Sequence, residues 1–359
     1  MSSPDSPPDP GQDGAADVVP DRMPDLVPDL RSDVVPEGPP VARRLGTDTF
    51  TIEGRAAPAL FVVGWLATIV GFGTVIVGIM SGGGLSATIL LVVAMIPLSV
   101  GLIAASGSQG IERRARGTLP YRGPSPFLVF AAAIPVSILA VIALSLPLVA
   151  LGVPVDGPLG ALLSVTVQAI VYVGLVRLLV VDTGALDWRA MGVRRFDRSA
   201  IAAIAYGALW TLPVIAVTVL VAAVLYAIFP VTPASPLPPT GTAAGFALSF
   251  IAGAIVAPFG EEILFRSFAT TAWARGMGAR RGLILGALFF AFAHVITVTG
   301  AGAGDALGLA LVAFVGRIPV ALALGWLFLR RGTIWASFGL HAVFNGSLLV
   351  LAEVAARSI

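Results

Sequence analysis

The chain has 359 residues, of which 57% are hydrophobic and only 12% are charged, and its mean hydropathy is +0.94. About a quarter of the residues of a soluble globular protein are charged, so this composition excludes a soluble domain and indicates a protein of the lipid bilayer. The chain contains no cysteine, which excludes disulfides, thiol nucleophiles and thiolate metal sites.

The first 56 residues differ in composition from the rest. Acidic residues recur at every fourth position from Asp5 to Glu37, and a proline directly precedes six of them. Because prolines at this density prevent both helix and strand, we predict that residues 1–56 form a disordered, acidic tail. The segment lacks the basic start and apolar core of a signal peptide.

Apolar runs long enough to cross a bilayer of about 30 Å follow this tail with short breaks. They predict an all-α fold, a polytopic transmembrane helix bundle in which residues 57–241 form N-terminal helices and residues 242–359 form the part that carries the candidate site. The nine predicted spans lie near residues 58–80, 85–105, 126–151, 158–181, 200–229, 242–268, 282–299, 306–329 and 334–352.

Arginines between these runs alternate from one connection to the next. They stand before the first run and after the second, fourth, sixth and eighth, whereas the connections 81–84, 152–157, 230–241 and 300–305 contain none. By the positive-inside rule the N-terminus is cytoplasmic and, with nine spans, the C-terminus lies outside. We therefore expect a multi-pass protein of the cell membrane.

Several polar residues of the last four spans are predicted to lie at one depth. Counted from the nearest cytoplasmic arginines at 1.5 Å per residue, Glu261, Glu262 and His294 lie about 20 Å into the bilayer and His341 about 15 Å. The two histidines are the only ones in the chain. Arg317 reaches a similar level. Ionisable groups inside a bilayer are costly, so these residues are functional candidates.

The stretch GEEILFRSFAT, residues 260–270, separates two roles by spacing. Glu262 and Arg266 are four residues apart on one helix face, which suits an ion pair. Glu261 is rotated by about 100° from Glu262, and this leaves its carboxylate free. Pro258 and Gly260 predict a break, after which a restarted helix would place both glutamates in its first turn.

The last two motifs add imidazole and amide groups. FAFAH sets Phe290 one turn before His294, and HAVFN sets His341 and Asn345 on one face. A carboxylate and an imidazole can orient and deprotonate a water molecule. A second imidazole and an amide can donate hydrogen bonds to a developing oxyanion. These groups meet the needs of peptide-bond hydrolysis without a covalent intermediate.

The motifs EEILFR, FAFAH and HAVFN, in this order within transmembrane helices, resemble those of the CPBP family of intramembrane proteases, also called the Abi or CAAX-protease family. The resemblance covers about residues 244–348. It implies an intramembrane endopeptidase in which Glu261 and His294 activate water. It also implies that His341 and Asn345 stabilise the oxyanion.

Supporting roles and alternatives follow from the same residues. The resemblance implies that Glu262 and Arg266 support the site, but this pair could also serve only helix packing. The ring of Phe290 is expected to line the site beside His294. Arg317 matches no motif of the family, and we expect it to be a counter-ion or a side chain that extends toward the membrane surface.

Two mechanisms are open because the family is usually labelled metalloprotease while a metal-free glutamate mechanism is also argued for it. The chain has no H-E-x-x-H motif, and two histidines exclude a three-histidine zinc site. Glu261, His294 and His341 could hold zinc with one open position. The metal-free version, which requires no cofactor, is favoured because Asn345 shares a helix face with His341 and suits a hydrogen-bonding pair.

The expected partners are the lipid bilayer and a membrane-associated protein or peptide substrate, with no nucleic acid, and the sequence does not determine the oligomeric state. Two other functions are open. One is a non-catalytic membrane scaffold or immunity factor. The other is a proton-coupled transporter, which predicts an internal repeat that the sequence does not show.

Overall fold

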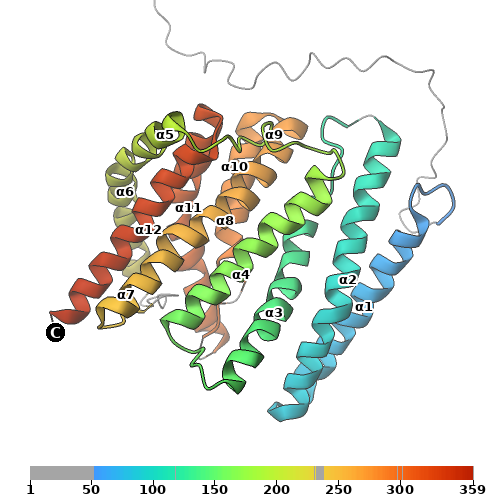
Figure 1. Ribbon diagram of the computed structural model, residues 1–359, viewed down its shortest axis with the longest axis horizontal. Coiled ribbons are helices and arrows are strands. Elements are labelled where there is room, and N and C mark those ends of the chain that lie inside the picture. The colour runs from blue at the N-terminus through green and yellow to red at the C-terminus, as the bar shows by residue number, and fades with distance from the viewer. Residues whose placement is uncertain are drawn as a thin grey trace, which may run out of the picture.

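The structure is a computed structural model, and it describes residues 52–117, 119–229, 231, 238–296, 298–300 and 302–358. The acidic repeat predicted to be a disordered tail lies outside these residues. Within the described ranges the chain forms helices and connections only, which confirms the all-α prediction. Figure 1 shows the helices leaning side by side in one bundle, with α1 and α2 at one side and α5 and α6 at the other.

The first half of the bundle contains six α-helices. They are α1 (Pro58–Met80), α2 (Gly84–Arg116), α3 (Pro126–Ala150), α4 (Pro158–Val176), α5 (Arg198–Leu209) and α6 (Thr211–Ile228). A π-helical segment, η1 (Arg177–Val181), extends α4. The predicted span at 200–229 consists of α5 and α6, which meet at Trp210.

The second half begins with one long composite helix. It runs through α7 (Ala243–Phe250), η2 (Ile251–Val256), α8 (Ala257–Glu261), η3 (Glu262–Thr270) and α9 (Thr271–Met277), where η2 and η3 are π-helical. Three further helices complete the bundle: α10 (Ala279–Ala293), α11 (Ala303–Arg331) and α12 (Ile334–Arg357).

Eight helical stretches among the described residues are long and apolar enough to cross a membrane, so the chain is a multi-pass membrane protein. The seventh predicted span, residues 282–299, is wrong in its extent. Its helix, α10, has 15 residues and ends at Ala293, so that His294 follows the helix instead of lying within it. The next residues are β-branched from Val295 to Thr299 and then Gly300, all poor helix formers, which explains the early end.

The predicted break before the two glutamates is also wrong. The composite helix continues from Ala243 to Met277 as one candidate span. Pro258 lacks an N–H group, and its ring crowds the carbonyl four residues earlier. The wider π-helical turns of η2 directly before α8 take up this misfit, and the N–H of Ala257 bonds to the carbonyl of Ala252, five residues back.

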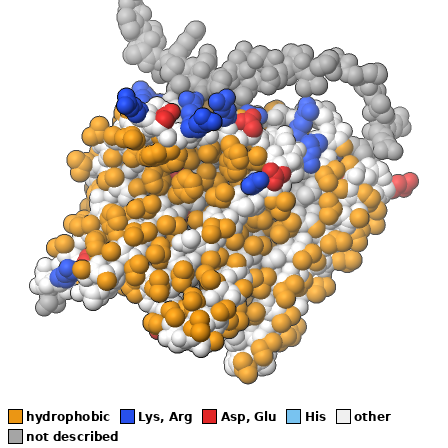
Figure 2. Space-filling view, in the orientation of Figure 1, with side chains coloured by type: hydrophobic (Ala, Val, Ile, Leu, Met, Phe, Trp, Pro, Cys, Tyr) orange, Lys and Arg blue, Asp and Glu red, His pale blue; other side chains and the backbone are white. Residues whose placement is uncertain are grey.

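The polarity of the bundle agrees with the predicted orientation. In Figure 2 the basic side chains gather at the end where α2 and α11 finish in Figure 1, and hydrophobic side chains cover the face shown. The chain after α10 still returns to the opposite end before α11 begins, and α12 also finishes at that opposite end (Figure 1).

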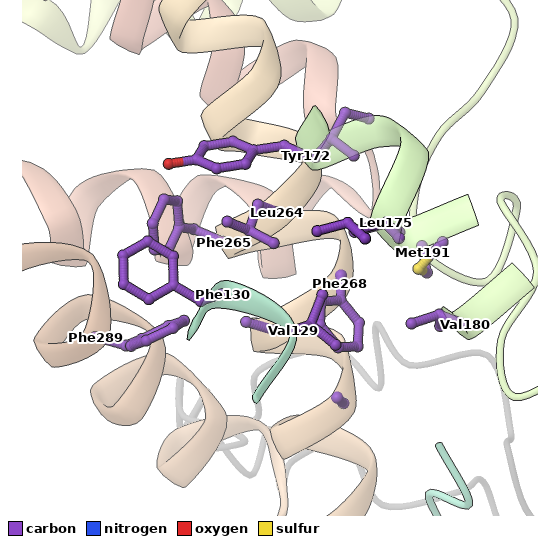
Figure 3. Packing of buried hydrophobic residues seen from close by; sticks show 14 of the residues in the cluster. Val129, Phe130, Tyr172, Leu175, Val180, Met191, Leu264, Phe265, Phe268 and Phe289 are labelled. Carbon is purple, nitrogen blue, oxygen red and sulfur yellow. The ribbon is translucent and has the colours of Figure 1, made fainter. Parts of the chain in front are cut away.

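An aromatic core lies between α3, α4, η3 and α10 (Figure 3). The ring of Phe265 packs 5.8 Å from Phe130, 6.4 Å from Tyr172 and 5.3 Å from Phe289, measured between ring centroids. Phe265 is 2% exposed. Because Phe265 belongs to η3, this core fixes the rotation of the segment that begins with Glu262.

Close backbone contact sets α12 against α5. A Cβ atom at Gly207 would collide with the carbonyl oxygen of Ala336, and one at Gly339 would collide with that of Ile204. Gly339 lies two residues before His341. This glycine-mediated approach therefore positions the start of the helix that carries the HAVFN motif.

Candidate active site

The structure brings six of the seven predicted site residues into one connected cluster, and they come from the composite helix, the region of α10, and α12, which are distant in sequence. Glu261 is the last residue of α8, and Glu262 and Arg266 belong to η3. The other three are Phe290 near the end of α10, His294 directly after α10, and His341 in α12.

Glu261 lies between the two histidines. Its Oε2 atom is 3.8 Å from Nε2 of His294 and 3.5 Å from Nε2 of His341. The side chain of His341 is 4% exposed, whereas those of Glu261 and His294 are 17% and 27% exposed. The cluster of Glu261, His294 and His341 is thus buried on the side of α12 and accessible on the side of α10.

The hydrogen bonds of the two imidazoles indicate their tautomers. Nδ1 of His294 lies 2.8 Å from the carbonyl oxygen of Phe290, and Nδ1 of His341 lies 2.9 Å from Oε1 of Glu262. The carbonyl oxygen of Phe290 can only accept a hydrogen bond, and so can the carboxylate of Glu262 in its ionised form. With these partners each Nδ1 carries the hydrogen. In the neutral rings both Nε2 atoms are then acceptors directed at Glu261. A water molecule between Oε2 of Glu261 and the two Nε2 atoms can donate its two hydrogens to two of these three acceptors.

Glu262 and Arg266 form the predicted ion pair in a fully enclosed position. Nη1 of Arg266 is 3.5 Å from Oε1 of Glu262, and the two side chains are 2% and 0% exposed. The guanidinium carbon also lies 4.0 Å from the ring centroid of Phe290, a cation–π contact. Oε1 of Glu262 therefore contacts both Arg266 and His341, and this carboxylate joins the buried pair to the site.

Phe290 contacts three members of the site besides the helix it belongs to. Its ring centroid is 4.4 Å from that of His294 and 5.7 Å from that of His341, and Arg266 lies over its face. The ring is buried. Phe290 thus packs against both imidazoles and separates them from the aromatic core around Phe265.

Asn345 occupies a different position from the other predicted residues. Its Nδ2 atom donates a hydrogen bond of 3.0 Å to the carbonyl oxygen of Gly253 in η2. The π-helical turns of η2 offset this carbonyl from the regular helix ladder. Asn345 therefore ties α12 to the composite helix one turn from His341, and one N–H of its amide remains for another acceptor.

Several features that shape the site could not be predicted from sequence patterns. The π-helical segments on either side of Glu261 follow from no motif, although Pro258 and Gly260 mark the region as irregular. A Cβ atom at Gly260 would lie 2.8 Å from Ala169, so this glycine lets α4 approach the site closely.

The three predicted zinc ligands lie close to one another. Glu261 lies within 4.0 Å of both His294 and His341. The described part of the chain nevertheless contains no group of three or more His, Cys, Asp and Glu side chains arranged to hold a metal ion. In this arrangement Glu261, His294 and His341 therefore do not fit a metal site.

Comparison with known proteins identifies the region that holds these residues. Residues 243–347 match the family model described as Rce1-like, type II CAAX prenyl endopeptidase. No curated protein and no solved structure matches the chain. The matched region starts with α7, ends within α12, and includes all seven predicted site residues. The resemblance seen in the three motifs is thus confirmed, because residues 243–347 of this multi-pass membrane protein match a model of the CPBP, or CAAX-protease, family.

Proposed function

We propose that the protein is an intramembrane endopeptidase that hydrolyses a peptide bond of a membrane-associated protein or peptide, with water activated by Glu261 and His294. The observation that carries this proposal is the convergence of one carboxylate oxygen with the Nε2 atoms of the only two histidines, at 3.8 and 3.5 Å. The endopeptidase family model that residues 243–347 match supports the same class of reaction, peptide-bond hydrolysis.

In the first step a water molecule donates one hydrogen to Oε2 of Glu261 and the other to Nε2 of His294. Its oxygen bonds to the substrate carbonyl carbon, the carbonyl electron pair moves to oxygen, and Glu261 takes the proton. This is general-base catalysis by a positioned carboxylate. His294 is held for this role by its Nδ1 bond to Phe290.

The oxyanion is stabilised by His341 and Asn345. The proton on Glu261 can pass to Nε2 of His341, 3.5 Å away, and the resulting imidazolium faces the carboxylate of Glu262. Its Nε2–H then donates to the oxyanion, together with the second N–H of the Asn345 amide. When the carbonyl reforms, the C–N bond breaks and the amine nitrogen takes the proton.

The substrate is membrane-associated because the site lies within the helix bundle of a multi-pass membrane protein. An extended tail is easier to hydrolyse than an intact helix, because the backbone groups of a helix are already hydrogen-bonded to one another. We therefore propose an extended, membrane-tethered segment as the substrate.

The test compares wild type with Glu261→Gln and His294→Ala, each co-expressed with a library of membrane-anchored peptides and analysed by mass spectrometry. Glu353→Gln is the control, because Glu353 is a buried glutamate of α12 that bonds to Thr240 and Arg357 instead of the site. We expect cleavage products with wild type and the control and none with the other two variants. Equal insertion and equal melting temperatures would show that all four proteins fold.

Turnover retained in both Glu261→Gln and His294→Ala would overturn the proposed roles. A parallel arm adds a metal chelator to wild type; unchanged turnover is expected for the metal-free mechanism, and lost turnover restored by zinc would replace that mechanism. Peptide flux into liposomes that depends on Glu261, without cleavage, would indicate a transporter. Full activity of Glu261→Gln in the cell would indicate a scaffold.

A further inference from the structure

The end of the bundle where α2 and α11 finish carries many exposed arginines. They lie on four connections between helices or on the helix ends beside them, and Figure 2 shows basic side chains gathered along this end. We call ten exposed residues of this set the arginine surface: Arg116, Arg122, Arg189, Arg194, Arg195, Arg198, Arg280, Arg281, Arg330 and Arg331.

Hydrogen bonds join two of the connections that carry these arginines. At the start of α12, the N–H of Ile334 donates to the carbonyl oxygen of Gly192 at 3.1 Å. The indole N–H of Trp335 donates to the carbonyl oxygen of Arg194, also at 3.1 Å. The connection before α5 is thus held against the turn between α11 and α12, so the arginines of both belong to one surface.

The arginine surface has no acidic partners in the part of the chain that the structure describes. Ion pairs between arginine and a carboxylate there involve only Arg177, Arg266 and Arg357. Asp187 and Asp197 flank the arginines of the connection before α5, and both accept hydrogen bonds from backbone N–H groups instead. The positive-inside rule explains why arginines gather at this end, but it does not supply the charges that balance them.

The acidic repeat, residues 5–37, has the charge that would balance this surface, and the proposed function does not use it. Residues 1–40 contain nine acidic residues and two arginines. Because the acids recur at every fourth position, successive carboxylates are attached at most about 14 Å apart along the chain. Blocks of like charge often serve as interaction tails. The acidic repeat therefore complements the arginine surface in sign.

The acidic repeat is attached at the same end of the bundle as the arginine surface. The described chain starts at Ile52, and the N–H of Ala56 donates to Oε1 of Glu112 at 2.9 Å, four residues before Arg116. Glu37 is 15 residues before Ile52, a reach of at most about 50 Å. Such a tether gives a local concentration of about the mM range, so pairs of exposed charges that are weak singly can bind together.

We propose that the acidic repeat binds the arginine surface of its own chain through ion pairs between its carboxylates and the guanidinium groups. The planar guanidinium presents paired N–H groups that match a carboxylate. This interaction goes beyond the proposed function, because it involves neither Glu261 nor a substrate. It weakens as salt is added, because salt screens exposed charges over about 10 Å at 0.1 M and about 3 Å at 1 M.

The test measures the distance between two spin labels on the full-length protein, in nanodiscs of neutral phosphatidylcholine that each hold one copy. The chain has no cysteine, so labels attach only at Ser32→Cys, within the acidic repeat, and at Gly276→Cys. Gly276 is exposed, a Cβ atom there meets open space, and Arg280 follows four residues later. Double electron–electron resonance gives the distribution of distances.

A population of short distances is expected at about 0.1 M salt, and it should fall roughly threefold or more at about 1 M. Replacing the nine acids by Asn or Gln should lower it to the same extent without added salt. This variant changes no described residue, so the helix bundle is left as it is. The result therefore does not depend on variants of the bundle.

The second variant changes the arginine surface. Arg194→Gln/Arg195→Gln/Arg280→Gln/Arg281→Gln should also lower the population of short distances. Accessibility of the Gly276→Cys thiol from outside the nanodisc checks that this protein still inserts and folds. The control is Arg177→Gln, because this exposed arginine is already paired with an aspartate, and it should match wild type.

Two results would overturn the proposal. One is the same distribution of distances for wild type and for the variant without the nine acids. The other is an equal loss of short distances in the control and in the quadruple variant, which would mean a general effect of net charge. No readout requires cleavage, so failure of this proposal is distinct from failure of the proposed function.

Anionic lipid headgroups are the other ligand that exposed arginines bind at a membrane surface. Native mass spectrometry of protein purified from mixed lipids measures their enrichment. Enrichment that the quadruple variant loses, together with distances that do not respond to removal of the nine acids, would assign the arginine surface to lipid and overturn the proposal.

Discussion

Nδ1 of His341 lies 2.9 Å from Oε1 of Glu262, and neither side chain is more than 4% exposed. Glu262 also faces Arg266, so one enclosed carboxylate links a buried cation to an imidazole of the site. This relationship gives Glu262 a function besides helix packing. It fixes the tautomer and orientation of His341 and can stabilise its imidazolium.

Glu262→Gln therefore tests whether the second glutamate acts on the chemistry. The substitution keeps the shape of the side chain and removes its charge. We expect kcat to fall about 10- to 100-fold with little change in KM, the usual effect of losing the group that orients an active histidine. Steady-state cleavage of an identified peptide measures both constants. Glu353→Gln is the matched control, and an unchanged kcat for Glu262→Gln would leave the pair with a packing role only.

Arg266→Ala should lower the stability of the protein in detergent, because it leaves the Glu262 carboxylate buried without its cation. Removing one partner of a buried pair typically costs about 3–5 kcal/mol. The double variant Glu262→Gln/Arg266→Ala should lose less than the sum of the two single losses. Thermal unfolding of the four proteins gives the coupling. Arg280→Ala, at an exposed arginine of α10, is the control, and additive losses would contradict the pairing.

Gly260→Ala should displace the segment that carries Glu261. The added Cβ would lie 2.8 Å from both Cα and Cβ of Ala169 in α4, closer than real Cβ contacts allow. We expect lower stability and lower turnover. Adding Ala169→Gly removes one of the two colliding atoms and should restore part of both. If the double variant is no better than Gly260→Ala alone, the contact with α4 does not position the site.

Phe290→Leu keeps an apolar side chain but removes the ring that packs against Arg266, His294 and His341. Aromatic and cation–π contacts are each worth about 0.5–2 kcal/mol. We expect a moderate loss of stability and a larger fall in kcat, because the imidazoles lose their common neighbour.

Phe289→Leu provides the comparison for Phe290→Leu. Phe289 is adjacent in sequence, equally buried, and packs against Phe130 and Trp273 in the aromatic core. The variant Phe289→Leu should lose about as much stability as Phe290→Leu and keep the kcat of wild type. Parallel measurement of melting temperature and turnover separates the two effects. Equal falls in kcat for both variants would mean that Phe290 acts through packing alone.

The sequence predicted the helix bundle because the bilayer imposes strong local rules. A chain in lipid must satisfy its backbone within each segment, so long apolar runs become helices. The spacing of EEILFR and HAVFN likewise follows from helix geometry, which is local. Glu262 and Arg266 pair as this spacing predicts. The end of α10 does not follow from hydropathy, because hydropathy does not reflect the poor helix propensity of the β-branched residues after His294.

The relations between helices are what only the tertiary structure decided. Spacing along α12 directs His341 and Asn345 to one side, yet their partners, Glu262 and Gly253, belong to another helix. The π-helical turns around Glu261 and the approach of α4 at Gly260 depend on packing between segments far apart in the chain. The residue types of the site were thus determined by the sequence itself, because burying charge in lipid is costly wherever it occurs. Which atoms face one another was decided by helix packing, because that geometry arises from contacts that no single segment contains.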